Sequence, residues 1–242
     1  MSLRILSQKH FPGRGKGPYD DCAICAVYWA LAQVLPWLTP PGIDVFRAAA
    51  GVPDTDTGSE GLDENAMFRG LKGLWPDVAA ISTKMTGWSW RQFLDEAKGK
   101  GRPAALIVLS DLLPKNYGFV STATREAWHA IGGLHSEAAS WWAANPLDGP
   151  HNWPDKIDQP VLRSAVEAYR GGVHGVLLPT AAEALKLHPA YQQSVDDGIG
   201  PAEVEAAKVA GIELGKSEVR TIALSGLAAI EVDTALAKRA LG

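Results

Sequence analysis

The chain has 242 residues, of which 46% are apolar and 21% charged, so it can build a hydrophobic core and is not expected to be globally disordered. Its formal charge of -4 provides no basic footprint for nucleic acid, and two cysteines exclude a disulfide scaffold. No apolar segment approaches the ~20 residues that a membrane span needs, and charged residues interrupt any signal-peptide pattern. We therefore expect no membrane span, and either a cytoplasmic location or export without an N-terminal signal.

The first part of the chain is predicted to be mainly helical. A short strand is expected over residues 3–8, followed by an irregular loop over 11–18 that is rich in glycine and proline. Hydrophobic spacing and stop signals then predict further elements. The predicted helices cover 21–35, 44–50, 65–74 and 89–97, and a strand is predicted at 78–83.

The second part of the chain is predicted to form most of a sheet. An apolar, partly β-branched run predicts a buried strand at 103–109. Two short apolar runs, 127–134 and 139–144, lie close enough in sequence to predict an antiparallel hairpin. The remaining expected elements are a loop at 145–160, a helix at 160–169 and a strand at 173–178.

The composition changes after residue 179. Residues 180–242 are rich in alanine, glutamate and lysine, carry no strand signal, and predict two helices at 201–214 and 217–241. We therefore expect a main domain over 1–179 and a helical extension over 180–242. An amphipathic helix needs something to cover its apolar face, so this extension is a candidate binding segment for a protein partner.

One cysteine occupies a position suited to nucleophilic chemistry. Cys22 is expected in the first turn of the 21–35 helix, where Asp20 or Asp21 can cap the backbone N–H groups. The dipoles of that turn favour a thiolate over a thiol. Cys22 is therefore a candidate nucleophile, which needs a base and a residue that orients the base.

The predicted hairpin brings a suitable base and orienting residue together. His129 opens its first strand, and Asn145 follows the end of its second strand. Because the end of the second strand of a hairpin lies beside the start of the first, the two side chains are expected to be neighbours. A cysteine on a helix, followed by a histidine and an asparagine on adjacent strands, is the order of a papain-type triad.

These motifs resemble those of papain-like cysteine peptidases, in particular the compact group related to bacteriocin-leader-processing peptidases. The resemblance covers roughly residues 3–178 and is carried by Asp21-Cys22-Ala23, Trp128-His129-Ala130 and Asn145-Pro146. It implies an α+β, papain-like fold with a cysteine-bearing N-terminal helix and an antiparallel sheet bearing the histidine and asparagine. Similar domains occur in bacteriophage tail proteins and endolysins.

The resemblance also implies roles for individual residues. Cys22 would be the nucleophile, His129 the general base and acid, and Asn145 the orienting residue. The side chain of Gln8, with the backbone N–H of Cys22, would hold the oxyanion. Two positions depart from the family pattern: Ala23 replaces a glycine, and Gln8 lies farther upstream than usual, so that 11–18 would be an insertion.

The implied activity is hydrolysis of a peptide amide without a cofactor or metal. The phage association would make the substrate a bacterial cell-wall peptide and the protein virion-associated. A second hypothesis is that the papain-like fold persists without chemistry, in a structural or assembly component of a virion. Replacing Cys22 by alanine separates the two, because only an enzyme would lose turnover.

Several residues have competing interpretations. Cys25 is the alternative nucleophile, since the second cysteine of a Cys-x-x-Cys-like motif is the nucleophile in plant papains, and otherwise a small core residue. Asp148, in a turn-forming Asp-Gly, competes with Asn145 as the third member. A redox pair of Cys22 and Cys25 is disfavoured because no strand precedes it. A zinc site that adds His129 and His135 is disfavoured because an extended strand would separate the histidines by about 20 Å.

Overall fold

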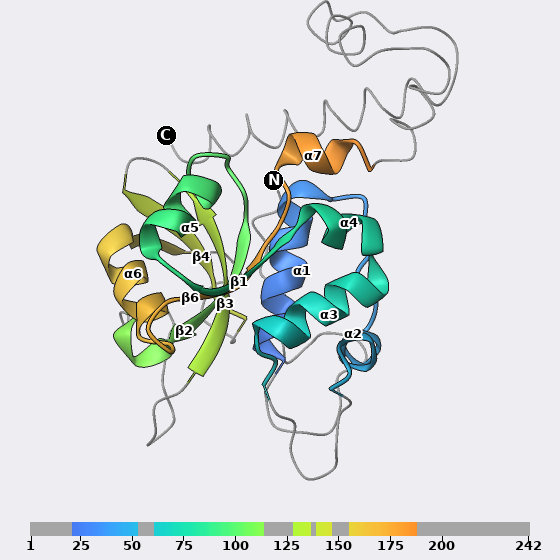
Figure 1. The fold of residues 1–242 in the computed structure, drawn as a ribbon, viewed down its shortest axis with the longest axis horizontal. Coiled ribbons are helices and arrows are strands. Elements are labelled where there is room, and N and C mark those ends of the chain that lie inside the picture. The colour runs from blue at the N-terminus through green and yellow to red at the C-terminus, as the bar shows by residue number, and fades with distance from the viewer. Residues whose placement is uncertain (1–20, 53–60, 114–127, 137–138, 147–154, 188–242) are drawn as a thin grey trace, which may run out of the picture. The chain divides into compact units, whose positions relative to one another are not determined.

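The computed structural model describes residues 21–52, 61–113, 128–136, 139–146 and 155–187 (Figure 1). The chain divides into two units, one over 3–181 and one over 182–242 with residues 1–2, and the site lies in the first. The expected strand at 3–8 and helices at 201–214 and 217–241 lie outside the described residues. The domain boundary and the partner-binding role of the extension therefore stay predictions.

The helices of the first unit form largely where the sequence predicts them. α1 (Cys22–Val34), α2 (Ile43–Ala50), α3 (Glu64–Leu74), α5 (Trp90–Ala97) and α6 (Gln159–Glu167) confirm five predicted helices. Local signals explain their ends: Gly51 ends α2 with φ 69°, and Asp63 caps α3 by accepting from the Ala66 N–H at 2.8 Å. None of the helices within the described ranges is long and apolar enough to cross a membrane.

The described strands form one antiparallel sheet in the order β1-β6-β2-β3-β4-β5. They are β1 (Thr83–Trp88), β2 (Ala104–Leu109), β3 (Trp128–His135), β4 (Ser140–Ala144), β5 (Asp155–Asp158) and β6 (Val173–Leu177). The hairpin of β3 and β4 is confirmed, with Gly132 opposite Ala144. The protein thus has the predicted α+β fold, with a cysteine-bearing helix at the start of the described chain and an antiparallel sheet.

Three elements differ from the predictions. The strand predicted at 78–83 is wrong, because Pro76–Ile81 form a helix, α4, and β1 begins only at Thr83. Pro76 suits the first turn of a helix, where its missing N–H costs nothing. The predicted loop at 145–160 contains β5, which pairs with β4. A short helix, α7 (Ala181–Leu185), was not predicted.

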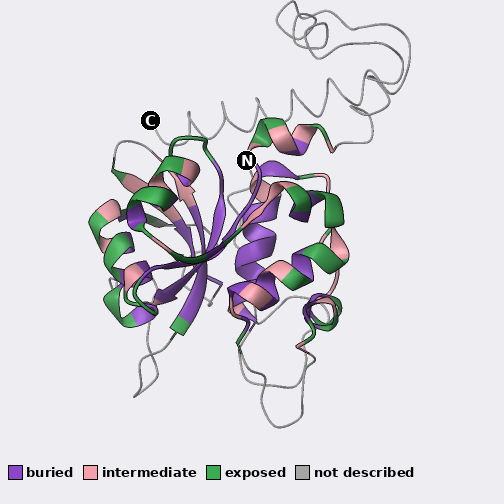
Figure 2. Cartoon of the chain, in the orientation of Figure 1, coloured by how far each residue is buried: buried purple, intermediate pink, exposed green. Residues whose placement is uncertain are grey.

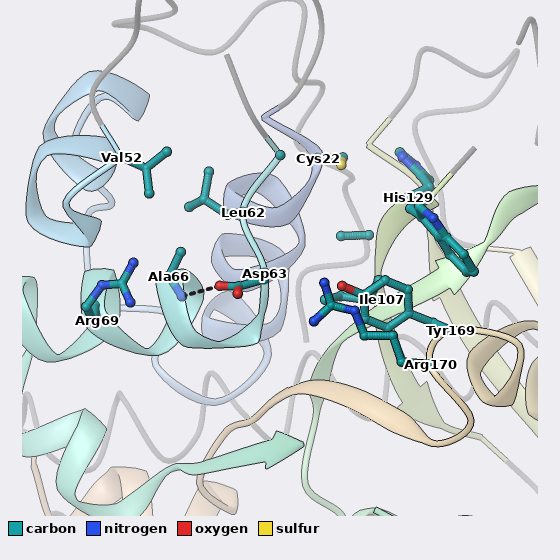
Figure 3. Close-up of a pocket in the computed structure, with 13 residues that line it drawn as sticks. Cys22, Val52, Leu62, Asp63, Ala66, Arg69, Ile107, His129, Tyr169 and Arg170 are labelled. Atoms are coloured by element: carbon teal, nitrogen blue, oxygen red, sulfur yellow. Dashed lines mark hydrogen bonds between the residues drawn. The ribbon is translucent and has the colours of Figure 1, made fainter. Parts of the chain in front are cut away.

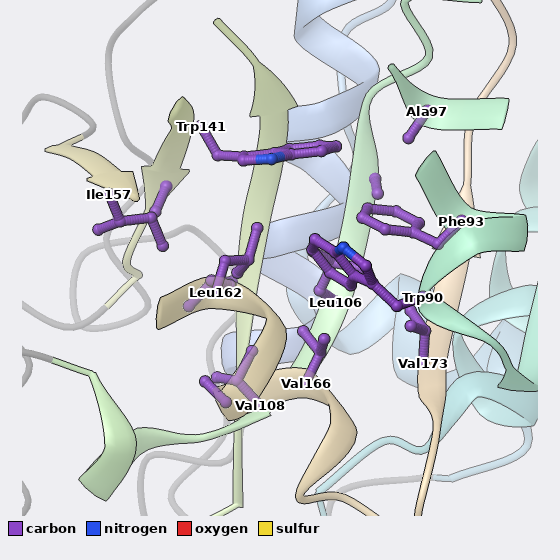
Figure 4. Packing of buried hydrophobic residues seen from close by; sticks show 14 of the residues in the cluster. Trp90, Phe93, Ala97, Leu106, Val108, Trp141, Ile157, Leu162, Val166 and Val173 are labelled. Carbon is purple, nitrogen blue, oxygen red and sulfur yellow. The ribbon is translucent and has the colours of Figure 1, made fainter. Parts of the chain in front are cut away.

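Helices cover the sheet on both faces (Figure 1). On one face, α5 and α6 bury a cluster in which Phe93 stacks on Trp141 with 5.1 Å between ring centroids (Figure 4). On the other face, α1 packs against β2 and β3. Most of its residues are buried, as Figure 2 shows, because it lies between the sheet and the neighbouring helices. The buried position of α1 fixes its first turn relative to the sheet.

A glycine sets how closely α1 approaches β3. A Cβ at Gly132 would lie 2.2 Å from Cε3 of Trp29, so the indole of α1 occupies the space that a side chain on β3 would need. Because protein interiors are close-packed, no neighbouring void can absorb such a shift cheaply. Gly132 therefore fixes the spacing between the helix that begins at Cys22 and the strand that carries His129.

Candidate active site

Cys22 is the first residue of α1 and is partly exposed at the wall of a pocket. In the first turn of a helix the backbone N–H groups lack intrahelical acceptors and point out of the helix end. Together with the helix dipole, these groups stabilise negative charge on a side chain at that position. The placement favours a thiolate at Cys22.

Asp21 is the N-cap residue of α1, but the expected capping bond does not form. Its side chain makes no capping hydrogen bond, and its Oδ1 instead binds Arg47 of α2. Arg47 Nε and Nη2 each lie 2.7 Å from that oxygen, and both side chains are buried. The carboxylate prefers this cation because a buried charge is costly unless an opposite charge accompanies it. Asp20, the other expected capping residue, lies outside the described residues.

His129 and Asn145 are joined as the hairpin predicts. His129 Nε2 lies 2.7 Å from Asn145 Oδ1, and both residues are buried. An amide oxygen only accepts, so the bond requires a proton on Nε2. The lone pair of the neutral ring is then on Nδ1, which makes Nδ1 the atom able to accept a proton.

The surroundings of His129 keep its ring neutral. Burial lowers its pKa from the ordinary 6.5 to about 4, although the hydrogen bond that Nε2–H donates to Asn145 acts in the opposite direction. At neutral pH the imidazole is therefore uncharged and available as a base. An imidazolium at this position requires a nearby negative charge, and the thiolate of the nucleophile would supply one.

Cys22 and His129 line the same pocket, which has a volume of about 680 Å³ (Figure 3). Figure 3 draws the two side chains at the same end of it. The volume lies within the range of about 300–1,000 Å³ that is usual for ligand sites. The other lining residues come from the residues just after α2, from α3 and the residues just before it, from β2 and β3, and from the turn after α6: Val52, Gly61, Leu62, Asp63, Ala66, Arg69, Ile107, Trp128, Ala130, Tyr169 and Arg170.

The alternative residues are placed differently. Cys25 is fully buried in α1, and burial, followed by the charges of Cys22 and Asp21, raises the pKa of its thiol. Cys22 and Cys25 form no disulfide. Gln8 and Asp148 lie outside the described residues. Among the residues that the structure describes, no group of three or more His, Cys, Asp or Glu could hold a metal ion.

The pocket also contains residues that the sequence analysis did not single out. Tyr169 packs edge-on against Trp128, with 4.7 Å between ring centroids, and Arg170 lies over the Tyr169 ring at 5.0 Å. Burial raises the pKa of the Tyr169 phenol, so the ring is neutral around pH 7. Of the tryptophans on the β3–β4 hairpin, Trp128 lines the pocket, whereas Trp141 is part of the core.

A second buried pair supports the same wall of the pocket. His174 on β6 is buried, and its Nδ1 lies 3.2 Å from Glu64 Oε1. Glu64 directly follows Asp63, and His174 packs edge-on against Tyr169. Two pocket residues are thus held by a polar contact between α3 and the sheet.

Comparisons with known proteins add a likeness of fold. No protein-family model matches the sequence, and no curated protein does. Among solved structures, one from Bacillus anthracis, provisionally described as a C39-like peptidase, matches with a TM-score of 0.48 and 13% identity. The match covers 73% of this chain and 94% of that one. A likeness of this extent carries no argument about chemistry, which depends on the geometry of the site.

Proposed function

We propose that this protein is a cysteine peptidase or amidase that hydrolyses a peptide amide with Cys22, His129 and Asn145. One observation carries the proposal: a cysteine at a helix N-terminus and a histidine bound to an asparagine line the same pocket. Cys25 is a poorer candidate, because it is buried and its pKa is raised. The third member is Asn145, which binds the imidazole directly.

The proposed reaction uses each residue at a stated atom. His129 Nδ1 accepts the thiol proton, and the Cys22 sulfur attacks the carbonyl carbon of the substrate amide. The first-turn N–H groups of α1 lie at the sulfur's end of the helix and stabilise the oxyanion, with Gln8 as the expected side-chain donor. His129 then protonates the amine, which leaves as a thioester forms on Cys22. Water, deprotonated by the same ring, hydrolyses the thioester to a carboxylate and restores the thiol.

The test is cleavage of a proteome-derived peptide library whose N-termini are blocked, with new N-termini identified by mass spectrometry. We expect cleavage by the wild-type protein and by Cys25→Ala, and none by Cys22→Ala or His129→Gln. Persistent cleavage by Cys22→Ala would contradict the proposal. If no variant cleaves and Cys22 alkylates no faster than an ordinary thiol, the non-catalytic structural role becomes the better hypothesis.

The finer proposal is that the substrate is a bacterial cell-wall peptide. The motif resemblance motivates bacterial cell-wall peptides, because similar domains occur in phage tail proteins and endolysins. Release of soluble peptides from purified peptidoglycan, compared between wild type and Cys22→Ala, checks this substrate. Absence of release, with cleavage of library peptides retained, would reject the cell-wall substrate and keep the peptidase.

A further inference from the structure

Two arginines line the pocket that contains Cys22. Arg69 projects from α3, and Arg170 comes from the turn between α6 and β6 (Figure 3). Arg69 donates from Nε to the Ala50 carbonyl at 2.8 Å, which fixes the side chain but uses only one of its donors. Within the described residues neither arginine forms an ion pair, so both guanidinium groups offer N–H donors to a ligand.

Arg170 is held in an unfavourable backbone conformation. Its φ is 51°, and it is the only residue other than glycine with a positive φ in the described part of the chain. A left-handed conformation costs a residue with a side chain about 1–2 kcal/mol. Contact with the Tyr169 ring holds the guanidinium at the pocket wall, where its charge faces the same space as Cys22. Such strain is retained where the fold requires the position of the residue.

The acidic group of the pocket is already engaged. Asp63 caps α3 through Oδ1, and its Oδ2 lies 3.4 Å from Asn65 Nδ2. Its charge is partly balanced by the positive end of that helix. The Tyr169 phenol adds no charge near neutral pH, because an ordinary phenol is neutral there and burial raises its pKa further. Among the described side chains that line the pocket, two are guanidinium groups, and the one carboxylate, Asp63, is engaged in capping α3.

The aromatic residues lie beside the arginine and beside the base. Trp128 immediately precedes His129 on β3 and is 44% exposed, which is unusual for a large apolar side chain. It contacts Tyr169, which in turn lies under Arg170. The three side chains form a continuous wall with an apolar part and a cationic end.

We propose that this wall binds a carboxylate of the substrate close to the amide that Cys22 attacks. Arg170 pairs with the carboxylate, Arg69 adds a second positive charge, and Trp128 and Tyr169 contact the apolar stem that carries it. A guanidinium suits this task because its planar N–H groups match the two oxygens of a carboxylate. The carboxylate belongs to an Asp or Glu side chain or to a free C-terminus. This inference rests on the proposed function of the site.

The first test compares two alkylating reagents that differ in charge. Iodoacetate and iodoacetamide both transfer a carbon to the Cys22 thiolate with loss of iodide, but only iodoacetate carries a carboxylate. The ratio of their rate constants cancels any change in thiol ionisation, so it reports attraction of the carboxylate. We expect Arg170→Gln to lower the ratio of iodoacetate to iodoacetamide about fivefold and Arg69→Gln to lower it less, because one nearby charge is lost.

Arg91→Gln is the matched control, because Arg91 is exposed on α5 and does not line the pocket. It should leave the ratio unchanged, and high salt should lower the wild-type ratio by screening. An unchanged ratio in both Arg170→Gln and Arg69→Gln would overturn the proposal. Circular dichroism of each variant verifies that it is folded before the rates are compared.

The second test uses peptides that the wild-type enzyme cleaves in the library experiment. Each is made in matched forms, with Glu or Gln next to the scissile bond and with a free or amidated C-terminus. A higher kcat/KM for one acidic form, reduced by Arg170→Gln, identifies the source of the carboxylate. Equal kcat/KM for all forms would overturn the inference and leave the peptidase intact. If nothing is cleaved and Cys22 alkylates no faster than an ordinary thiol, the proposed function fails, and the reagent ratio still tests the carboxylate site.

Discussion

Asp21 and Arg47 form a buried ion pair directly before the candidate nucleophile, with two guanidinium nitrogens 2.7 Å from one carboxylate oxygen. A carboxylate adjacent to Cys22 would by itself disfavour a thiolate, because like charges raise each other's energy. The positive charge of Arg47 opposes this effect. The pair therefore connects α2 to the start of α1 and also sets the charge beside the sulfur.

This geometry predicts opposite effects of two substitutions on the Cys22 thiol. Arg47→Gln leaves the Asp21 carboxylate without this cation and should raise the thiol pKa by about one unit. Asp21→Asn leaves the cation and should lower the thiol pKa. The measurement is the rate of iodoacetamide alkylation at Cys22 between pH 4 and 9, read site by site by mass spectrometry.

Both substitutions should also destabilise the fold, by about 3 kcal/mol, because each breaks a buried pair. Stability alone therefore cannot distinguish an electrostatic role from a structural one. Shifts of the Cys22 thiol pKa in opposite directions in the two variants would show that the role is electrostatic. If both variants shifted the thiol pKa in the same direction, the electrostatic role of the pair would be rejected.

Because His129 is buried and neutral, we expect the free energy of unfolding to fall in mild acid. The folded protein keeps the imidazole unprotonated down to about pH 4, whereas the unfolded chain takes up a proton near pH 6.5. The unfolded state thus binds more protons in this window, so the contribution of His129 is complete above pH 6.5 and is lost as the pH falls toward 4. The full loss is about 3 kcal/mol, from 1.36 kcal/mol per pKa unit.

Urea unfolding of wild type and His129→Gln at pH 7, 5.5 and 4 measures this contribution. Carboxylates also titrate in this range, but they are common to both proteins and cancel in the difference. The free-energy difference between the two should shrink as the pH falls. A difference that is independent of pH would mean that His129 is charged, or equally solvated, in the folded state.

The sequence predicts the parts of the fold that depend on neighbouring residues. The apolar run after Cys22 and the two short apolar runs around 127–144 are strong local signals, and α1 and the β3–β4 hairpin form there. The short apolar run at 78–81 is ambiguous, since four residues fit a strand or a helix, and Pro76 decides for the helix. The pairing of His129 with Asn145 follows from the hairpin, so it could be predicted as well.

Contacts between distant segments could not be predicted. Arg47 lies 26 residues from Asp21, and no pattern near either residue indicates that the two side chains meet. The helix predicted at 160–169 forms as α6, but its sequence does not show that Arg170, which follows it, reaches the pocket of Cys22. These arrangements depend on how α2, α3 and the sheet pack together, which no local pattern encodes.

Asn145 should control the titration of His129. Asn145→Asp places a carboxylate on Nε2–H and should raise the His129 pKa by one to three units, because an adjacent opposite charge favours the imidazolium. Asn145→Ala removes the hydrogen bond that raises the pKa, so the pKa should fall below about 4. NMR titration of the His129 ring nitrogens measures both shifts. The other histidines serve as internal controls, and equal His129 titration in all three proteins would refute a positioning role for Asn145.

Gly132→Ala should separate the nucleophile from the base. Its Cβ would lie 2.2 Å from Trp29 Cε3, so α1 must move away from β3, at a cost of about 1–3 kcal/mol for overpacking. Because α1 begins at Cys22 and β3 carries His129, the alkylation rate of Cys22 should fall together with stability. Adding Trp29→Phe makes room for the new Cβ. The double variant should therefore lose less stability and less alkylation rate than the sum of the two single losses, as expected for residues in contact. If the double variant lost the sum of the two single losses, the spacing of the site would not depend on this contact.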